Sequence, residues 1–172
     1  MISVILMVLA GTLCVFRFHF TWQAVITFLW LGMLILIGIH DHRTMEIPDR
    51  YNLILWGIGL VSMLPVFFSG SGSSLSLADR ALGFFIISLP MFSVDMLIPG
   101  GFGGGDIKLM AAAGWFLGWK GNLLAAVLAF AAAGVYSIFL LITGRAGRKD
   151  SFAFGPFLCV GLAFSVLSGQ FL

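Results

Sequence analysis

The chain has 172 residues, of which 60% are hydrophobic and only 9% are charged, and its formal net charge is +2. Soluble domains carry about 25% charged residues, so this composition excludes a water-soluble globular domain, and the weak net charge gives no indication of nucleic-acid binding. We therefore predict an all-α, polytopic transmembrane helix bundle that forms a single integral-membrane domain over residues 1–172.

Seven apolar runs follow one another along the chain. They cover residues 2–16, 22–40, 52–68, 81–98, 107–119, 122–143 and 152–171. A membrane-spanning helix needs roughly 20 residues, so the short first and fifth runs leave the prediction at six or seven spans. The first run has no basic residue before it and no small-residue cleavage site after it, which favours a retained anchor over a signal peptide. The Ser/Gly-rich stretch 69–79 predicts a flexible external connection.

The basic residues predict the orientation of the bundle. With a cytoplasmic amino terminus and seven spans, six basic residues fall in inside loops: Arg43, Arg50, Lys108, Arg145, Arg148 and Lys149. Three fall in outside loops: Arg17, Arg80 and Lys120. This excess on the inside agrees with the positive-inside rule, and it requires the fifth run to cross the membrane.

Two aspartates stand at the ends of apolar runs. Asp41, in "GIHDHRTMEIPD", ends the second run, and Asp106, in "GFGGGDIKLM", begins the fifth. On the predicted topology both lie at the cytoplasmic face. A carboxylate near the bilayer core costs about 2.5–3.5 kcal/mol on insertion scales, so such a residue points to function.

Two carboxyls in one site tend to share a proton, and such a pair can activate water and polarise an amide carbonyl. We therefore predict peptide hydrolysis by Asp41 and Asp106, with no metal and no cofactor. The helix dipole favours a charged group at a helix start and a neutral group at a helix end. This predicts Asp106 as the base and Asp41 as the resting acid.

The glycines before Asp106 are expected to support the site. Gly103, Gly104 and Gly105 would let the backbone approach a substrate closely, and free N–H groups at a helix start could bind the peptide or an oxyanion. The alternative is that they form only a tight turn. The small-residue stretches "AAAG" at 111–114 and 131–134 predict close contacts between helices.

Other polar residues near these motifs have simpler expected roles. Asp49 is expected to cap the helix that follows it, and Glu46 to be a solvated loop charge. Lys108 is expected to anchor the interface or attract nearby acids. Asp95 is the rival carboxylate, because it lies near the same membrane face and could pair with Arg43 or Lys108.

At these residues the sequence resembles the type IV prepilin peptidase family, membrane aspartic proteases of the GxGD class. The resemblance lies in "DHRTMEIPD" (Asp41 through Pro48 to Asp49), in "GGGDIKL" (Gly103–Leu109) and in "FGPF" (154–157). It implies that Asp41 and Asp106 are the two catalytic aspartates. It also implies a prepilin or pseudopilin precursor as substrate, with a short basic leader before a hydrophobic helix, cut at the cytoplasmic face of the bacterial inner membrane.

The chain departs from the larger family members in one respect. Those members carry paired Cys-x-x-Cys motifs and also methylate the new amino terminus. The only cysteines here are Cys14 and Cys159, so we expect peptidase activity without N-methylation.

Two other function classes stay open on sequence grounds. In a small transporter or channel component, Asp41, Asp95 and Asp106 would form an ion or proton relay, and the glycine-rich break would be an unwound binding segment. A catalytically silent assembly protein is the third class.

Overall fold

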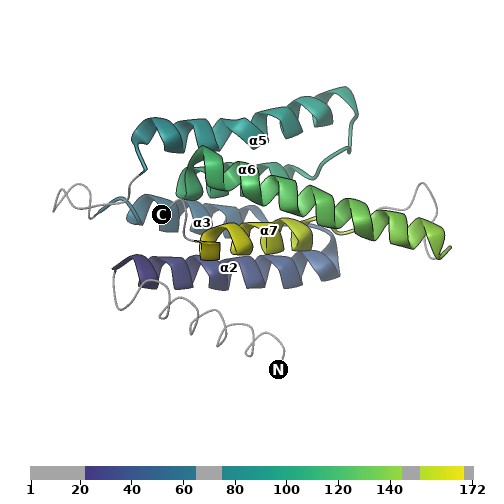
Figure 1. Cartoon of the computed structure of the whole chain (residues 1–172), viewed down its shortest axis with the longest axis horizontal. Helices are drawn as coiled ribbons and strands as arrows, with labels where there is room; N and C mark the ends of the chain where they lie inside the picture. The colour runs from purple at the N-terminus through teal and green to yellow at the C-terminus, as the bar shows by residue number, and fades with distance from the viewer. Residues whose placement is uncertain (1–21, 65–74, 145–151, 169–172) are drawn as a thin grey trace.

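The computed structural model describes residues 22–64, 75–144 and 152–168. Within these ranges the chain forms only helices and turns: α2 (Trp22–Thr44), α3 (Asp49–Val61), α5 (Leu77–Leu97), α6 (Gly104–Ile142) and α7 (Gly155–Ser168). Figure 1 shows them packed side by side along the long axis of the molecule. The predicted all-α class is confirmed for the described residues, whereas the predicted first run, at 2–16, lies outside them.

Three described helices, α2, α5 and α6, are long and apolar enough to cross a membrane, and α7 is a shorter apolar helix. Helix α3 ends at Val61, earlier than the predicted run over 52–68. Helix α5 begins at Leu77, because Ser76 and Asp79 form a reciprocal capping box at its start. The prediction of a flexible loop over 69–79 is therefore wrong for its last residues, which belong to this cap and to the first turn.

The chain reverses direction inside α6. Gly118 has φ 71° and ψ 178°, a conformation that is not helical and that favours glycine. The side chain of Asn122 donates a hydrogen bond of 3.1 Å to the carbonyl of Met110, 12 positions earlier. These groups would lie about 18 Å apart along a continuous helix, so the fifth and sixth apolar runs form two segments that fold back on each other at Gly118.

The reversal packs tightly against α5. A Cβ on Gly83 would meet backbone atoms of Gly114, Gly118 and Trp119, and Asn122 also donates to the Gly83 carbonyl at 2.9 Å. Arg80, which the topology prediction placed in an outside loop, is instead 1% exposed in α5, and its Nη1 donates to the Trp115 carbonyl at 2.9 Å. A buried guanidinium needs such hydrogen-bond acceptors, and the methylene groups of Arg80 also lie within the bundle.

The core lies between α2, α6 and α7. Trp30 of α2 stacks on Phe116 of α6 with ring centroids 4.8 Å apart, and Leu158 and Leu162 of α7 are fully buried in the same cluster. Large apolar side chains cover the outer surface as well, such as Val135 with 70% exposure. A protein surface of this kind is stable in contact with lipid.

One end of the bundle gathers the parts that carry the sequence motifs. The end of α2 and the start of α7 meet there, as the hydrogen bond from the Gly155 backbone N–H to Asp41 shows. Helices α3 and α6 both begin at this end, joined by a contact between Asn52 and Gly105. In Figure 1 this end lies on the right, where α2 turns blue and α7 starts.

Candidate active site

Asp41 is the first of the two predicted carboxylates, and it is buried in the last turns of α2, with 4% exposure. Its Oδ2 accepts a hydrogen bond of 2.9 Å from the backbone N–H of Gly155, at the start of α7. A Cβ at position 155 would lie 2.6 Å from that same oxygen. Glycine at this position therefore lets the start of α7 sit directly on the carboxylate.

Asp106 lies in the first turn of α6 and is 9% exposed. Its backbone N–H donates to the Gly103 carbonyl at 3.0 Å, which closes the first turn after the glycines. Its Oδ1 is buried without a hydrogen-bond partner among the described residues. A buried polar atom of this kind is costly unless a water or a ligand satisfies it.

Both carboxylates line the same cavity, which has a volume of about 200 Å³ and which we call the aspartate cavity. Its lining residues are Asp41, Met45, Glu46, Ile47, Gly103, Gly104, Gly105 and Asp106. The structure thus brings together the two aspartates and all three glycines that the sequence singled out. Glu46, expected as a solvated loop charge, is exposed but also faces this cavity.

The loop after α2 reaches the cavity through an unusual backbone conformation. Met45 has φ 54°, in the left-handed region, and its N–H donates to the Asp41 carbonyl at 2.8 Å. This residue ends α2 as a left-handed helix cap does. Non-glycine residues seldom adopt this region, and such backbone strain is concentrated at functional sites. Nothing in the sequence around Met45 predicts this conformation.

Gly105 is needed for close packing of the two motif loops. A Cβ at this position would lie 2.7 Å from Ile47 Cβ and 2.9 Å from the Ile47 carbonyl oxygen, whereas a Cβ on Gly104 would meet nothing within 4 Å. The two glycines therefore differ. Gly105 admits the Ile47–Pro48 segment, and Gly104 leaves open space at the cavity wall.

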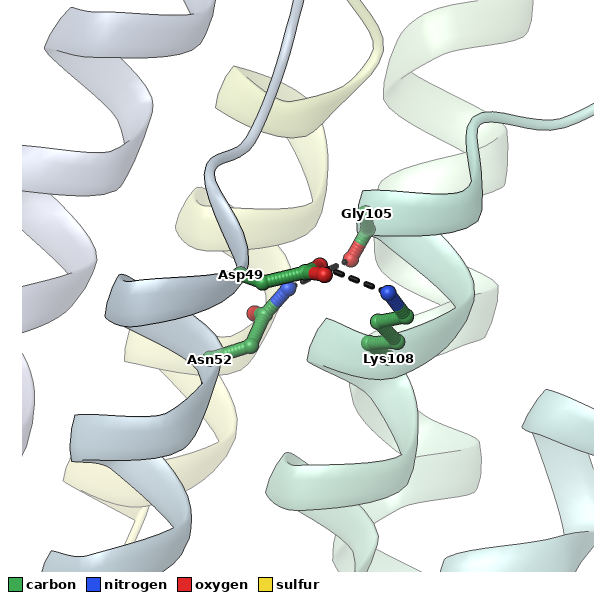
Figure 2. A network of polar contacts seen from close by, with 4 residues as sticks. All are labelled: Asp49, Asn52, Gly105 and Lys108. Carbon is green, nitrogen blue, oxygen red and sulfur yellow. Dashed lines mark hydrogen bonds and ion pairs between the residues drawn. The ribbon is translucent and has the colours of Figure 1, made fainter.

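Two polar contacts join the start of α3 to the start of α6. Lys108 Nζ lies 2.6 Å from Asp49 Oδ1, and Asn52 Nδ2 donates to the Gly105 carbonyl at 3.1 Å. Figure 2 shows these four residues pointing toward one another across the space between the two helices. Lys108 thus attracts a nearby acid, which was one of its two expected roles.

The predicted capping role of Asp49 is wrong. The N-cap of α3 is Pro48, which makes no side-chain capping hydrogen bond, and Asp49 is the first residue of the helix. Its carboxylate turns outward to Lys108 because that ammonium supplies a stronger, charge-assisted partner than the exposed N–H groups of the first turn.

A second, larger cavity lies beside the aspartate cavity. Its volume is about 460 Å³, and we call it the α3–α5–α6 groove after the helices that line it. Its apolar lining consists of Leu53, Trp56, Phe84 and Ala111. Its polar lining consists of Asp49, Arg50, Asn52 and Lys108. No motif predicted this groove, because its residues come from three separate helices.

The rival carboxylate Asp95 has a structural task. Its Oδ1 accepts from the backbone N–H of Gly100 at 3.1 Å and of Phe102 at 3.4 Å, so it orders the loop between α5 and α6. It does not line the aspartate cavity, and the expected partner Lys108 pairs with Asp49 instead. In the described part of the chain, no three His, Cys, Asp or Glu side chains gather to form a metal site.

The roles expected from the helix dipoles, with Asp106 as the base and Asp41 as the resting acid, stay a prediction. A hydrogen bond from a backbone N–H stabilises a carboxylate ion, and Asp41 has such a bond from Gly155. Asp106 Oδ1 has no donor among the described residues. The Asp106 carboxylate does have a hydrogen bond from the Gly103 backbone, so hydrogen bonding does not distinguish the two groups, and the division of roles is a property of the coupled pair.

Apolar helices, a lipid-compatible surface and a buried carboxylate pair facing one cavity define a membrane protein with a polar site. Residues 28–138 match the type IV leader peptidase family. The chain belongs to this family, which confirms the resemblance seen in the sequence.

Curated relatives carry the same description. The chain is 28% identical over 170 residues to a prepilin leader peptidase/N-methyltransferase of Bacillus subtilis (strain 168), covering 92% of this chain and 64% of the relative. It is 32% identical over 158 residues to the protein of that name from Legionella pneumophila, covering 90% and 53%. A relative of that name from Pectobacterium carotovorum is 31% identical over 160 residues, covering 87% and 52%.

The chain thus spans between about half and two thirds of the length of these three relatives. No solved structure matches it significantly.

Proposed function

We propose that this protein is an aspartic endopeptidase that removes the short basic leader from prepilin or pseudopilin precursors. The observation that carries the proposal is the single cavity of about 200 Å³ that Asp41 and Asp106 line together, although they come from distant parts of the chain. Family membership and the printed names of the relatives support the substrate class.

The chemistry requires one ionised and one protonated carboxyl. The ionised group takes a proton from water, whose oxygen attacks the scissile carbonyl carbon, while the protonated group gives its proton to the carbonyl oxygen. The tetrahedral intermediate then collapses, the C–N bond breaks, and the leaving nitrogen receives the proton taken from water. The hydroxyl proton returns to the second carboxyl, so the pair again holds one proton.

The residues around the pair have supporting roles in this proposal. Gly103, Gly104 and Gly105 form the cavity wall beside Asp106, where free N–H groups of the first turn are suited to bind a substrate carbonyl. Pro48 is the N-cap of α3 and Asp49 is its first residue, and the pair of Asp49 with Lys108 joins this start to α6. These residues thus keep the loop before α3 next to the loop before α6.

We further propose six or seven membrane spans, a cytoplasmic amino terminus, and an active site that faces the cytoplasm of a bacterial cell. The excess of basic residues in the inside loops supports this orientation. The reversal at Gly118 supports two antiparallel segments within α6, the arrangement that the fifth and sixth spans need.

Co-expression with a prepilin tests the function. The wild-type chain should shorten the precursor on a gel, while Asp41→Asn and Asp106→Asn should each abolish cleavage, because the amide can neither take up nor release the required proton. Asp79→Asn is the matched control, since Asp79 belongs to the capping box at the start of α5; it should still cleave.

Comparable membrane levels of all variants must be shown on a blot. An uncut precursor with the wild-type chain, or cleavage that survives both active-site changes, would remove the peptidase proposal and leave the ion-relay class as the stronger interpretation.

A further inference from the structure

We propose that the α3–α5–α6 groove binds the apolar segment that follows the scissile bond in the precursor, while the basic leader lies on the side of the aspartate cavity. This inference rests on the proposed function and adds the place and direction in which the substrate lies. It follows from the contact between the residues that line the two cavities, from the apolar lining of the groove, and from the charges on either side.

The residues that line the two cavities meet where α3 and α6 begin. Gly105 lines the aspartate cavity, Asn52 lines the groove, and the Asn52 side chain donates to the Gly105 carbonyl at 3.1 Å. A peptide with its scissile bond beside Asp106 therefore needs only a few residues to reach the groove, at about 3.3 Å per extended residue. A substrate that extends in one direction from the aspartates therefore reaches the groove.

Asn52 belongs to the contact between the two cavities and is itself buried. Its side chain is 4% exposed, and its Oδ1 has no hydrogen-bond partner among the described residues. A buried amide oxygen accepts from N–H or O–H groups. This oxygen is itself closed off from the surface, so the groove offers a bound segment its apolar side chains rather than the Asn52 amide.

The charges set the direction. Three acidic residues line the aspartate cavity, namely Asp41, Glu46 and Asp106, and none of the basic residues that the structure describes lines it. The groove has the opposite balance, because Arg50 and Lys108 stand there with the single acid Asp49. A basic leader is attracted to the first cavity and repelled by the second.

The groove wall suits a hydrophobic occupant. Trp56 is held in place by stacking on Trp115, with centroids 5.8 Å apart, and by an edge contact with Phe84 at 5.6 Å. Leu53 lies at the rim with 75% exposure. A preformed aromatic surface loses little conformational freedom on binding, so the apolar segment gains from contact here without reshaping the site.

Site-specific photo-crosslinking tests the placement. A benzophenone amino acid replaces Leu53 in one variant and Val160 in a control, since Val160 is also an apolar, exposed residue (67%) but belongs to α7, which does not line the groove. Both variants carry Asp106→Asn so that bound precursor stays uncut. Precursor should crosslink at position 53 through residues just after its cleavage site, at least about five times more than at position 160.

Three results would overturn the inference. These are equal crosslinking at both positions, crosslinks from position 53 to the leader, and a lipid adduct at position 53 that added precursor does not reduce. The proposed function is judged separately, by cleavage with the wild-type chain. Cleavage without a preferred crosslink at position 53 removes only the groove assignment, while absence of cleavage removes both.

Kinetics give a second measurement that does not depend on crosslinking. In detergent, Leu53→Ser should raise KM for the precursor about tenfold and leave kcat within about twofold, because the change removes binding to the apolar segment and leaves the carboxylates untouched. Val160→Ser should change neither constant. A fall in kcat at unchanged KM for Leu53→Ser would contradict the groove assignment.

Discussion

Asp41 and Gly155 are 114 positions apart, yet the Gly155 backbone N–H donates to the Asp41 carboxylate at 2.9 Å. This contact joins the end of α2 to the start of α7 and fixes one oxygen of the carboxylate. The "FGPF" motif thereby acquires a structural meaning, because its glycine is the residue that touches the aspartate.

We expect Gly155→Ala to impair cleavage. The added Cβ would lie 2.6 Å from Asp41 Oδ2, so either the carboxylate or the start of α7 must move. A displacement of about 1 Å in a catalytic group costs up to about 100-fold in rate. Precursor cleavage should fall at least tenfold, measured at equal membrane levels, whereas Gly134→Ala, where a Cβ would meet nothing within 4 Å, should cleave normally.

The two glycines before Asp106 should differ in their effect on stability. Gly105→Ala places a Cβ 2.7 Å from Ile47 Cβ and 2.9 Å from its carbonyl oxygen, while Gly104→Ala meets nothing within 4 Å. Overpacking of this kind costs typically 1–3 kcal/mol. Thermal unfolding in detergent should show a lower midpoint for Gly105→Ala alone, and equal midpoints for both variants would argue against the close approach of the Ile47 segment to Gly105.

The two "AAAG" stretches should also separate in a stability measurement. We predicted close helix contacts for both, but only Gly114 faces such a contact: its Cβ would collide with the Gly83 backbone, while a Cβ on Gly134 has open space. Gly114→Ala should therefore destabilise the protein by more than about 1 kcal/mol. Gly134→Ala should be neutral or slightly stabilising, because alanine has the higher helix propensity; a neutral Gly114→Ala would contradict the packing of α5 on α6.

The Asp49–Lys108 pair should contribute little to stability. Both side chains are largely exposed, at 74% and 56%, and exposed ion pairs are worth about 0.2–1 kcal/mol. A double-mutant cycle with Asp49→Asn and Lys108→Met should give a coupling energy in that range that shrinks at high salt. A coupling well above 1 kcal/mol, insensitive to salt, would show that the pair is buried in the membrane-embedded protein.

Much of the candidate site could be predicted because its signals are local. Asp41 and Asp106 stood out as charges at the ends of apolar runs, and the prediction that they meet followed from counting spans and basic loops. The structure places both in one cavity, which is the outcome that this reasoning requires. The glycines were recognised as well, but their letters could not show that only Gly105 is pressed against Ile47.

Two of the incorrect predictions share one cause. Asp49 was expected to cap α3, and Arg80 was expected in an outside loop, because each judgement used only neighbouring residues. In the structure Lys108, 59 positions away, attracts Asp49, and the Trp115 carbonyl, 35 positions away, accepts from Arg80. Contacts between residues so far apart along the chain compete with local preferences, and the neighbouring residues do not predict them.

The amino-acid sequence by itself determined the class of this protein, since hydropathy and the cost of burying charge depend on composition and order alone. It also singled out the two carboxylates for the same reason. Only the tertiary structure decided that Gly155 touches Asp41, that α6 folds back at Gly118, and that an apolar groove adjoins the aspartates. Each of these features depends on which helix faces lie against one another, and that choice is made by the packing of the whole chain.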